Sequence, residues 1–368
     1  MPAAERMARL GRRGRGLVAS LDLIRSAGPS YYVRRLRDQR RFAPLDQGGR
    51  DALYERIWRE AAAEVGAEAV GLAPGALEIS RDGVRTRVLQ QTVALDDAAT
   101  LQVALEKPLA LRLLADAAVT IPEHVECTYG DPKPALEFLA RCEAPVVVKP
   151  VAAAGGSGTT AGVAEPAELR RALLHAARSG DRLLVERQAP GAVYRLLLLD
   201  GELLDVIRNT PASVVGDGSS KIAELMRVEN ERRVKAGGAA GLERLGVELD
   251  LLLTLERAGL SLSSVPAAGR TVPIRTITSD NGAAHTETYR GPLSDDLLAE
   301  ARAATQAVGL TLAGVDVITP DPTRPLREVG GVINEVNGTP GIHHHYVVAD
   351  PEGATRVAIP ILERLLRG

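Results

Sequence analysis

Asp316 and, nineteen residues later, Glu335 and Asn337 are the residues of this chain best suited to chemistry. They lie in two apolar runs, 313–318 and 332–337, that are typical of β-strands. Successive strand side chains point to opposite faces, so Glu335 and Asn337 share one face of the sheet. The connecting segment is rich in Pro and Gly and short enough for a hairpin-like return, which would bring Asp316 beside the pair.

These three side chains offer only oxygen ligands. Two carboxylates and a carboxamide on rigid strands suit Mg²⁺ and do not suit zinc. The alternative is two acidic residues on the water-facing side of antiparallel strands, which is a common arrangement. Their positions alone leave both interpretations open.

Lys149 and the turn after it could bind phosphate. Lys149 lies in the strand-like run 144–150, and a flexible backbone after it can aim several N–H groups at phosphate oxygens while the ammonium supplies a charge. The turn residues are Gly155, Gly156, Ser157 and Gly158. Their spacing matches neither a P-loop nor a dinucleotide fingerprint, so an ordinary hairpin loop stays the alternative.

Lys107 and Glu186 are two further candidates. Only five of the 45 basic residues are Lys, and an ammonium is compact enough for a single phosphate oxygen, although drift in composition would also explain Lys107. Glu186 ends a buried strand and precedes a polar break at Arg187, Gln188 and Ala189. It could accept a hydrogen bond from an exocyclic amine while the backbone of the break reads a ring edge, or it could face water.

The composition bounds the class of protein. At 368 residues, with a hydrophobic fraction of 45% and an aromatic fraction of 3%, the chain can form two or three packed units with cores of Ala, Leu and Val. The net charge of −2 gives no general attraction to polyanions. Cys127 and Cys142 provide no disulfide framework. We therefore expect a cytoplasmic protein with no membrane span and no secretory signal.

The first fifty residues are strongly basic, with twelve Arg against four acidic residues. For residues 1–40 we favour a partly helical arm that is solvated or frayed, and a contact with nucleic acid or a membrane is the alternative. Neither nucleic acid nor a membrane is expected as the main partner, because the remainder of the chain is acidic.

The hydrophobic pattern predicts a mixed α/β chain. Helices are expected at residues 49–65, 105–118, 166–178, 222–235 and 294–308. Strands are expected at residues 77–79, 86–89, 144–150, 183–186, 194–199 and 202–208 and in the two acidic runs, with hairpin turns at Asp82-Gly83 and Asp200-Gly201. Residues 209–292 are otherwise irregular, which usually marks a substrate loop or a lid.

The most specific string is Asn-Glu-Val-Asn-Gly-Thr-Pro-Gly at residues 334–341. Together with the Lys-Pro and glycine-rich segment, the strand-end Glu186 and the earlier Asp316, it resembles the ATP-grasp superfamily over about residues 105–350. The resemblance implies an α/β (α+β) fold in which two α/β subdomains clasp ATP. The expected division is a basic arm with a small α/β cap (1–104), a central subdomain (105–185) and a carboxyl-terminal subdomain (186–368) that includes the substrate loop 209–292.

The resemblance also assigns roles. It implies two Mg²⁺ ions on Asp316, Glu335 and Asn337, with ATP as the second cofactor. It implies that Lys107 and Lys149 bind ATP, that residues 155–158 cover the phosphates, and that residues 186–189 form the adenine hinge.

Within the superfamily, the chain is most similar to the ATP-grasp domain of cyanophycin synthetases and related amino-acid or peptide ligases with a D-alanine–D-alanine ligase-like core. The similar strings are residues 211–218, 221–225, 264–269 and 313–316. Arg195 matches an Arg expected to hold the developing acyl phosphate or a substrate carboxylate, and Arg208 and Arg290 are further candidates. Val193 replaces the usual ribose-binding acid, and Gly155 replaces a usual His. A full cyanophycin synthetase is not expected, because no Mur-ligase-like domain follows.

Three consecutive histidines, His343 to His345, follow the specific string. Consecutive residues of a helix or a strand cannot all face one ion, so a tri-His metal site is disfavoured. One of them, with His343 as the candidate, could lie near the transferred phosphate or the amine, and a surface role is the alternative.

The function implied by the resemblance is ATP-dependent, ADP-forming ligation of a carboxylate to an amine through an acyl phosphate. The substrates would be small molecules such as amino acids or peptides, and a homodimer is left open. The alternatives are an ATP-grasp kinase, which makes a stable phosphoryl product, and a non-catalytic ATP-binding protein.

Overall fold

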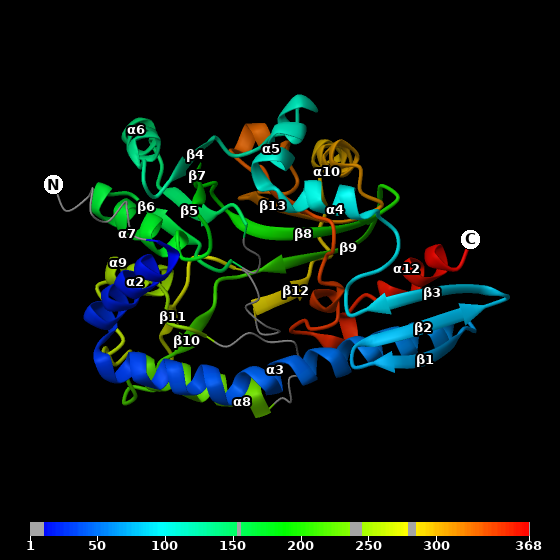
Figure 1. The fold of residues 1–368 in the computed structure, drawn as a ribbon, viewed down its shortest axis with the longest axis horizontal. Helices are drawn as coiled ribbons and strands as arrows, with labels where there is room; N and C mark the ends of the chain where they lie inside the picture. The colour runs from blue at the N-terminus through cyan, green and yellow to red at the C-terminus, as the bar shows by residue number, and fades with distance from the viewer. Residues whose placement is uncertain (1–10, 153–155, 236–244, 279–284, 368) are drawn as a thin grey trace.

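The computed structural model describes residues 11–152, 156–235, 245–278 and 285–367, without the side chains of residue 12 and of residues 30–47 and 234–235. Its core consists of two larger antiparallel sheets, each with helices on one face, and a small three-stranded sheet beside them (Figure 1). The predicted α/β class is confirmed. The division into domains at residues 104/105 and 185/186 stays a prediction.

A five-stranded sheet carries both acidic strands. In spatial order its strands are β12 (Thr286–Thr288), β9 (Glu202–Asn209), β8 (Ala192–Leu199), β13 (Leu312–Thr319) and β14 (Val332–Asn337). The predicted turn at Asp200-Gly201 joins β8 to β9, with positive φ angles of 51° and 79°. One face packs against α4 (Ala98–Leu105), α5 (Lys107–Asp116) and α10 (Asp295–Val308). The acidic residues therefore lie on the opposite face.

A four-stranded sheet carries Lys149. Its strands are β4 (His124–Thr128), β7 (Arg182–Arg187), β5 (Val146–Pro150) and β6 (Thr160–Val163), in that order. The helices α6 (Lys133–Arg141) and α7 (Pro166–Ala176) cover the face that contains Val146 and Val148. Because strand side chains alternate, Lys149 points away from these helices.

The basic amino-terminal segment is packed on the four-stranded sheet's helices. In α2 (Arg12–Ala27), Ala19 and Leu23 are buried, because their i, i+4 spacing places them on one helical face. Asp22 accepts hydrogen bonds from Arg171 and from His175 of α7, the latter at 2.9 Å. The expectation of a solvated or frayed arm is therefore wrong for residues 12–27.

The following helix, α3 (Pro29–Glu64), is the longest described element and runs along one side of the molecule (Figure 1). It ends beside a sheet of β1 (Glu68–Ala73), β2 (Ala76–Arg81) and β3 (Val84–Leu89), whose predicted Asp82-Gly83 turn is confirmed. Tyr54, Ile57 and Trp58 bury their side chains against this sheet, against α12 (Ala358–Leu365) and against the five-stranded sheet. None of the described helices is long and apolar enough to cross a membrane.

Residues 209–292 form more structure than their sequence predicts. The strands β10 (Ser213–Val215) and β11 (Thr271–Pro273) pair, and α8 (Ile222–Lys235) and α9 (Leu249–Arg257) pack against them. Met226, Leu251 and Ile274 are among the buried residues of this small core. The predicted α8 is confirmed, but α9 was missed because its nearly continuous Leu run hides the helical period.

Candidate active site

Asp316 and Glu335 lie directly opposite each other on β13 and β14. Cross-strand partners point to the same face, and Asn337 lies two residues beyond Glu335, so all three side chains share the face away from α10. The predicted hairpin-like return is confirmed, with the short helix α11 (Leu326–Val329) in the connection. Strand alternation buries Val336 in the core and directs its neighbours Glu335 and Asn337 to the opposite face of the sheet.

Arg195 reaches Asp316 from the neighbouring strand β8, where it is the cross-strand partner of Asp316. Its Nε and Nη2 donate to the two carboxylate oxygens at 2.7 and 2.8 Å, a bidentate pair. Asn337 Nδ2 donates to Asp316 Oδ2 at 3.3 Å. These bonds fix the Asp316 carboxylate within a row of polar side chains across three strands, here called the acidic row, which consists of Arg195, Asp316, Glu335 and Asn337.

Lys107 supplies a second cation from the start of α5. Its Nζ lies 3.2 Å from Glu335 Oε1, and the two side chains are 13% and 29% exposed. Burial alone favours the neutral form of Glu335, but the charges of Lys107, Lys149 and Arg195 outweigh it and hold the pKa of the carboxyl below its usual range. Glu335 is therefore an anion held among three cations that come from two sheets and a helix.

Lys149 and Glu186 form a buried ion pair on adjacent strands of the four-stranded sheet. Lys149 Nζ lies 2.8 Å from Glu186 Oε1, with side-chain exposures of 9% and 3%. Glu186, expected at the adenine hinge, is thus beside the lysine expected at the phosphates. The backbone N–H groups of Arg187 and Gln188 donate to Glu123 O and Pro145 O at 2.8 and 2.9 Å. Other groups of the 186–189 segment would therefore have to form the hydrogen bonds to the adenine ring.

The turn after Lys149 is described from Gly156 onward, and Gly155 lies outside the described residues. Gly156 and Gly158 have positive φ angles of 69° and 73°, which glycine adopts without strain. A Cβ on Gly158 would lie 3.5 Å from Ala176 Cα of α7. The turn is therefore close-packed on its helix side.

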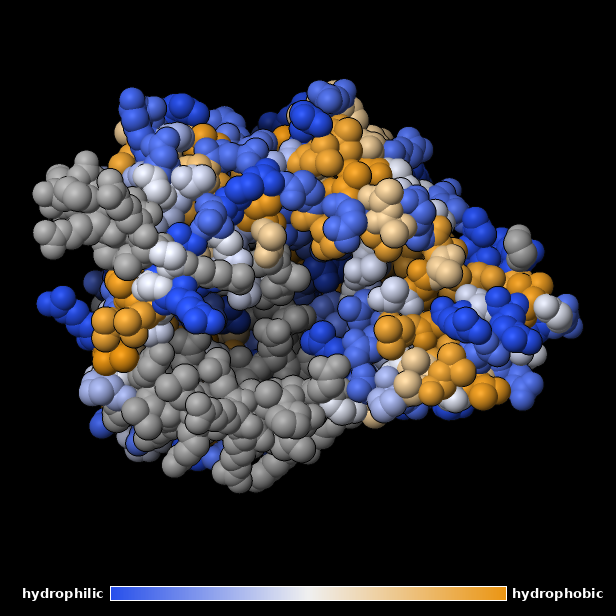
Figure 2. All heavy atoms as spheres, viewed as in Figure 1, coloured by the Kyte–Doolittle hydropathy of each residue, from blue (hydrophilic) through white to orange (hydrophobic). Residues whose placement is uncertain are grey.

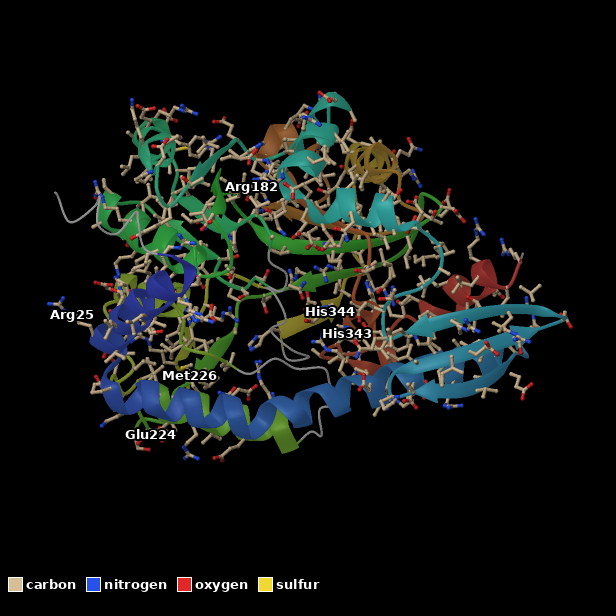
Figure 3. The ribbon with its side chains drawn as sticks, viewed as in Figure 1. Arg25, Arg182, Glu224, Met226, His343 and His344 are labelled. Atoms are coloured by element: carbon tan, nitrogen blue, oxygen red, sulfur yellow. The ribbon has the colours of Figure 1, made fainter. Side chains whose placement is uncertain are left out.

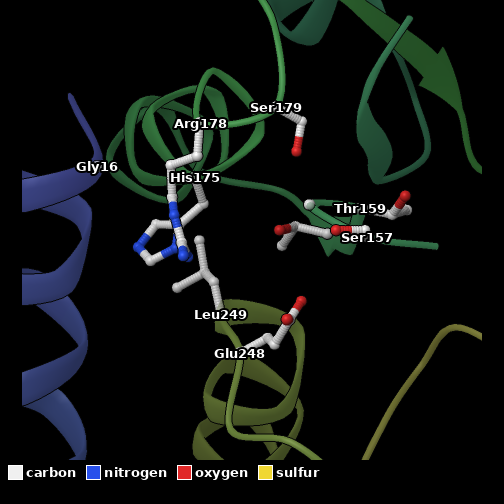
Figure 4. Close-up of a pocket in the computed structure, with 10 residues that line it drawn as sticks. Gly16, Ser157, Thr159, His175, Arg178, Ser179, Glu248 and Leu249 are labelled. Atoms are coloured by element: carbon white, nitrogen blue, oxygen red, sulfur yellow. The ribbon is translucent and has the colours of Figure 1, made fainter. Parts of the chain in front are cut away.

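A pocket of about 250 Å³ lies behind this turn (Figure 4). It opens between the turn, the end of α7 and the start of α9; the lining residues include Gly16, Ser157, Thr159, His175, Arg178 and Glu248. Because α7 covers the face opposite to Lys149, this pocket is separate from the acidic row. Figure 2 shows that the surface is also hollowed near the centre of its face, where hydrophilic side chains gather.

Two candidate arginines lie elsewhere. Arg208 is the cross-strand partner of Tyr194 and pairs with Glu287 at 2.5 Å, so it points to the face opposite Arg195. Arg290 donates to Asp205 Oδ1 at 3.1 Å. Neither lies at the acidic row. Strand alternation directs Arg208 to the other face, and the buried Asp205 holds Arg290.

Two of the three histidines, His343 and His345, form buried hydrogen bonds. Figure 3 shows His343 and His344 below the five-stranded sheet. They lie in the 3-10 helix η2 (Ile342–His345), where His343 Nδ1 is 2.7 Å from the hydroxyl of Tyr54 of α3. His345 Nδ1 is 2.7 Å from Asp205 Oδ2, and burial lowers the pKa of His345 although Asp205 raises it. His343 and His345 are both buried, so neither has a surface role.

Oxygen donors, partial burial and surrounding cations make the acidic row a fit for Mg²⁺ in type. The described residues contain no group of three or more His, Cys, Asp or Glu side chains with metal-ligand placement. Two carboxylates and a carboxamide leave coordination positions for waters and phosphate oxygens, which Mg²⁺ commonly retains. Carboxylate oxygens have further lone pairs beyond those that Arg195 and Asn337 occupy, so the bonds in place do not exclude an ion.

Tyr54 and Asp205 were missed from the sequence as residues of interest. Tyr54 resembled an ordinary core residue of an amphipathic helix, and Asp205 lay inside an apolar strand. An acid at an expected inward strand position is a usable signal, because a buried carboxylate requires partners.

Comparison with known proteins agrees with this geometry, although no protein-family profile matches the chain. A cyanophycin synthetase of Trichormus variabilis is 32% identical over 268 residues, which cover 72% of this chain and 29% of that protein. The glutathione biosynthesis bifunctional protein GshAB of Mannheimia succiniciproducens is 30% identical over 249 residues, covering 65% and 32%. The chain thus spans about a third of the length of these relatives.

Among solved structures, the bifunctional glutathione synthetase from Pasteurella multocida superimposes with a TM-score of 0.53 at 23% identity, covering 84% of this chain and 43% of that one. The matches in sequence and the shared fold confirm the resemblance. The chain belongs to the ATP-grasp superfamily.

Proposed function

We propose that this protein is an ATP-dependent carboxylate–amine ligase that releases ADP and phosphate. The observation that carries the proposal is the polar row of Arg195, Asp316 and Glu335, with Lys107 beside it. Phosphoryl transfer depends mainly on alignment and charge neutralisation, and this row provides both cations and metal-type oxygen ligands on a rigid sheet. The name of one relative, a cyanophycin synthetase, supports the same reaction class.

In the proposed reaction a substrate carboxylate oxygen attacks the γ-phosphorus of ATP, and ADP leaves. The nitrogen of an amine then attacks the acyl carbon, phosphate leaves and the nitrogen loses a proton. Lys107 and Lys149 neutralise phosphate oxygens, and the Arg195 fork orients the acyl phosphate or the carboxylate that forms it. Glycine backbone N–H groups of the turn 155–158 bind the phosphates.

Asp316, Glu335 and Asn337 would hold two Mg²⁺ ions. Bound by these side chains, the metal would supply neutralisation of the negative charge that develops during phosphoryl transfer. The same three side chains have a second task, because they hold Arg195 and Lys107 at the phosphates through the bonds described above.

Hydroxylamine trapping tests this function. The protein is incubated with ATP, Mg²⁺ and a panel of amino acids and other carboxylates, and both ADP and hydroxamate are measured. A ligase gives acid-dependent hydroxamate, whereas a kinase gives ADP and a stable phosphoryl product without hydroxamate. A protein that binds ATP but releases no ADP with any carboxylate would contradict the proposal.

A further inference from the structure

The row of polar side chains on the five-stranded sheet continues beyond Arg195. On the next strand, β9, Asp205 is the cross-strand partner of Leu197, which lies two residues from Arg195 on β8 and therefore shares its face. Asp205 is fully buried, and His345 Nδ1 lies 2.7 Å from its Oδ2. The histidine segment η2 is thus anchored on the acidic row's own face, one strand further along the sheet.

The start of η2 also lies beside the acidic row. Pro340, which shortly precedes η2, packs on Gly314, because a Cβ added to Gly314 would lie 2.9 Å from Pro340 Cβ. Gly314 is the cross-strand partner of Asn337 and lies on the same strand as Asp316. Both ends of η2 are therefore fixed next to residues of the row.

Electrostatic effects on His345 show how close η2 lies to Arg195. Burial is the largest cause that lowers the pKa of His345, and the charges of His344 and Arg195 act in the same direction. Both side chains therefore lie within electrostatic reach of one buried imidazole. Lys107 lies on the β14 side of Arg195, at Glu335, whereas η2 contacts β9 on its other side.

His344 is held in place by its neighbour. His343 is 4% exposed, and its Nδ1 lies 2.7 Å from the hydroxyl of Tyr54. The ring of half-buried His344 stacks on the ring of His343, with centroids 4.0 Å apart and planes inclined at 35°. In the view that Figures 2 and 3 share, His343 and His344 lie at the side of the central hollow. One ring is therefore anchored in the core and leaves the other partly open to solvent.

The other histidines do not combine these properties. All six histidines of the chain lie in its described part. His343 and His345 are buried, His175 lines the pocket behind the glycine-rich turn, His124 belongs to β4 of the four-stranded sheet, and His285 precedes the edge strand β12. His344 is therefore the histidine that is both partly exposed and next to the acidic row.

Amide formation requires a proton acceptor near Arg195. An aliphatic amine is a cation at neutral pH, and its nitrogen has no lone pair for attack until one proton has left. Lys107, Lys149 and Arg195 are cations in this site and have no lone pair to accept that proton. Histidine is the side chain whose neutral form most readily takes up a proton near neutral pH.

We propose that His344 is the catalytic residue that takes a proton from the amine, with His343 and Tyr54 as the positioning residues behind it. The inference rests on the proposed ligase function. The ammonium form of the amine gives one proton to a ring nitrogen of His344, and the freed lone pair forms the C–N bond to the acyl carbon. The C–O bond to phosphate then breaks, and phosphate leaves with the electron pair and takes the second proton of the nitrogen. His344 returns its proton to water.

The test uses two kinds of nucleophile that differ in their need for this acceptor. Hydroxylamine is uncharged at neutral pH and can attack without first losing a proton, whereas methylamine, ammonia and the proteinogenic amino acids are mainly cations. The acid is the one that supports hydroxamate formation in the unaltered protein. Hydroxamate, amide, KM for ATP and thermal unfolding are measured for His344→Gln, His344→Ala, Tyr54→Phe and the control Lys133→Gln, which removes an exposed cation from α6.

For His344→Gln we expect kcat for amide formation to fall about 100-fold or more, the usual contribution of a positioned general base. Hydroxamate formation and KM for ATP should stay within about twofold, because hydroxylamine does not need the base. Free imidazole should restore part of the amide formation to His344→Ala. Tyr54→Phe, which releases His343, should lower amide formation about 10-fold, and Lys133→Gln should match the unaltered protein.

Three outcomes would overturn the assignment. Equal losses of hydroxamate and amide in His344→Gln would show a structural or phosphate-binding role instead. Unchanged amide formation by that variant excludes the proton transfer. An unaltered protein that forms hydroxamate but no amide with any of these amines also contradicts the proposal, because the acceptor would then have no nucleophile to serve. Failure of the ligase function is distinguished from all three, because then the unaltered protein itself forms no hydroxamate.

Discussion

Glu335→Gln is the most informative single substitution, because it removes one charge and keeps the size of the side chain. Glu335 lies 3.2 Å from Lys107 and is 29% exposed. At an effective dielectric constant of about 20, that separation corresponds to a Coulomb attraction of about 5 kcal/mol, most of which is offset by desolvation. We therefore expect the free energy of unfolding to fall by about 1–3 kcal/mol, the range for a hydrogen bond to a charged group.

The expected effect on activity is larger than the effect on stability. Loss of one ligand and of the charge that positions Lys107 should lower hydroxamate formation at least about 100-fold, comparable with the loss of one preorganised transition-state contact. The Mg²⁺ concentration for half-maximal ADP release should rise as well. Both are measured at saturating ATP, with thermal unfolding of the same samples.

Glu328→Gln is the matched control. Glu328 makes an exposed ion pair with Arg324, four residues away on the β13–β14 connection. Removing it should change stability by less than about 0.5 kcal/mol and leave activity unchanged. Near-normal turnover by Glu335→Gln at the same Mg²⁺ concentration would refute the assignment of Glu335 to the metal site.

Three other predictions concern separate features. Arg195→Lys replaces the bidentate contact with Asp316, at 2.7 and 2.8 Å, by a single point charge. It should lower kcat for hydroxamate formation about 10- to 100-fold, and an unchanged kcat would count against the role of Arg195 in orienting the acyl phosphate. Burial lowers the pKa of His345 below the value of about 6.5 that a histidine has in the unfolded chain, so the unfolded state binds more protons at acidic pH. The free energy of unfolding should therefore fall from pH 7 to pH 5 by up to about 1.4 kcal/mol per pH unit. His345→Gln should flatten that slope in urea titrations, and an identical slope would contradict the prediction. Burial raises the pKa of Cys127 to about 11, so peptide mass spectrometry should find it alkylated by iodoacetamide at pH 8 only after denaturation, and rapid native alkylation would exclude this burial.

The acidic hairpin could be predicted from the sequence because its signals are local. Strand alternation determines which of residues 332–337 share a face, and the short connection determines that Asp316 returns beside them. The pairing with Arg195 was beyond such reasoning. It depends on β8 lying next to β13, although more than a hundred residues separate the two strands.

The arginine candidates show the same limit. Arg208 and Arg195 lie on adjacent strands, and only the cross-strand register reveals that they point to opposite faces. Arg290 resembled a site residue because no local pattern indicates that Asp205 accepts its hydrogen bond from inside an apolar strand.

The α2–α3 hairpin has a mechanical consequence. A helix of 36 residues is about 54 Å long, so α3 reaches from α2, which packs on α7, to the small sheet β1–β3. The chain passes between the two larger sheets at the α5–β4 and β7–β8 connections, and the α2–α3 pair adds an outer link that is made by packing. Any rotation that separates the sheets must bend the chain at Gly28, where φ is 92°, or detach Asp22 from His175 and Arg171. A truncation that removes residues 1–27 would remove this outer link, and would lower the stiffness of the protein without changing a side chain of the acidic row.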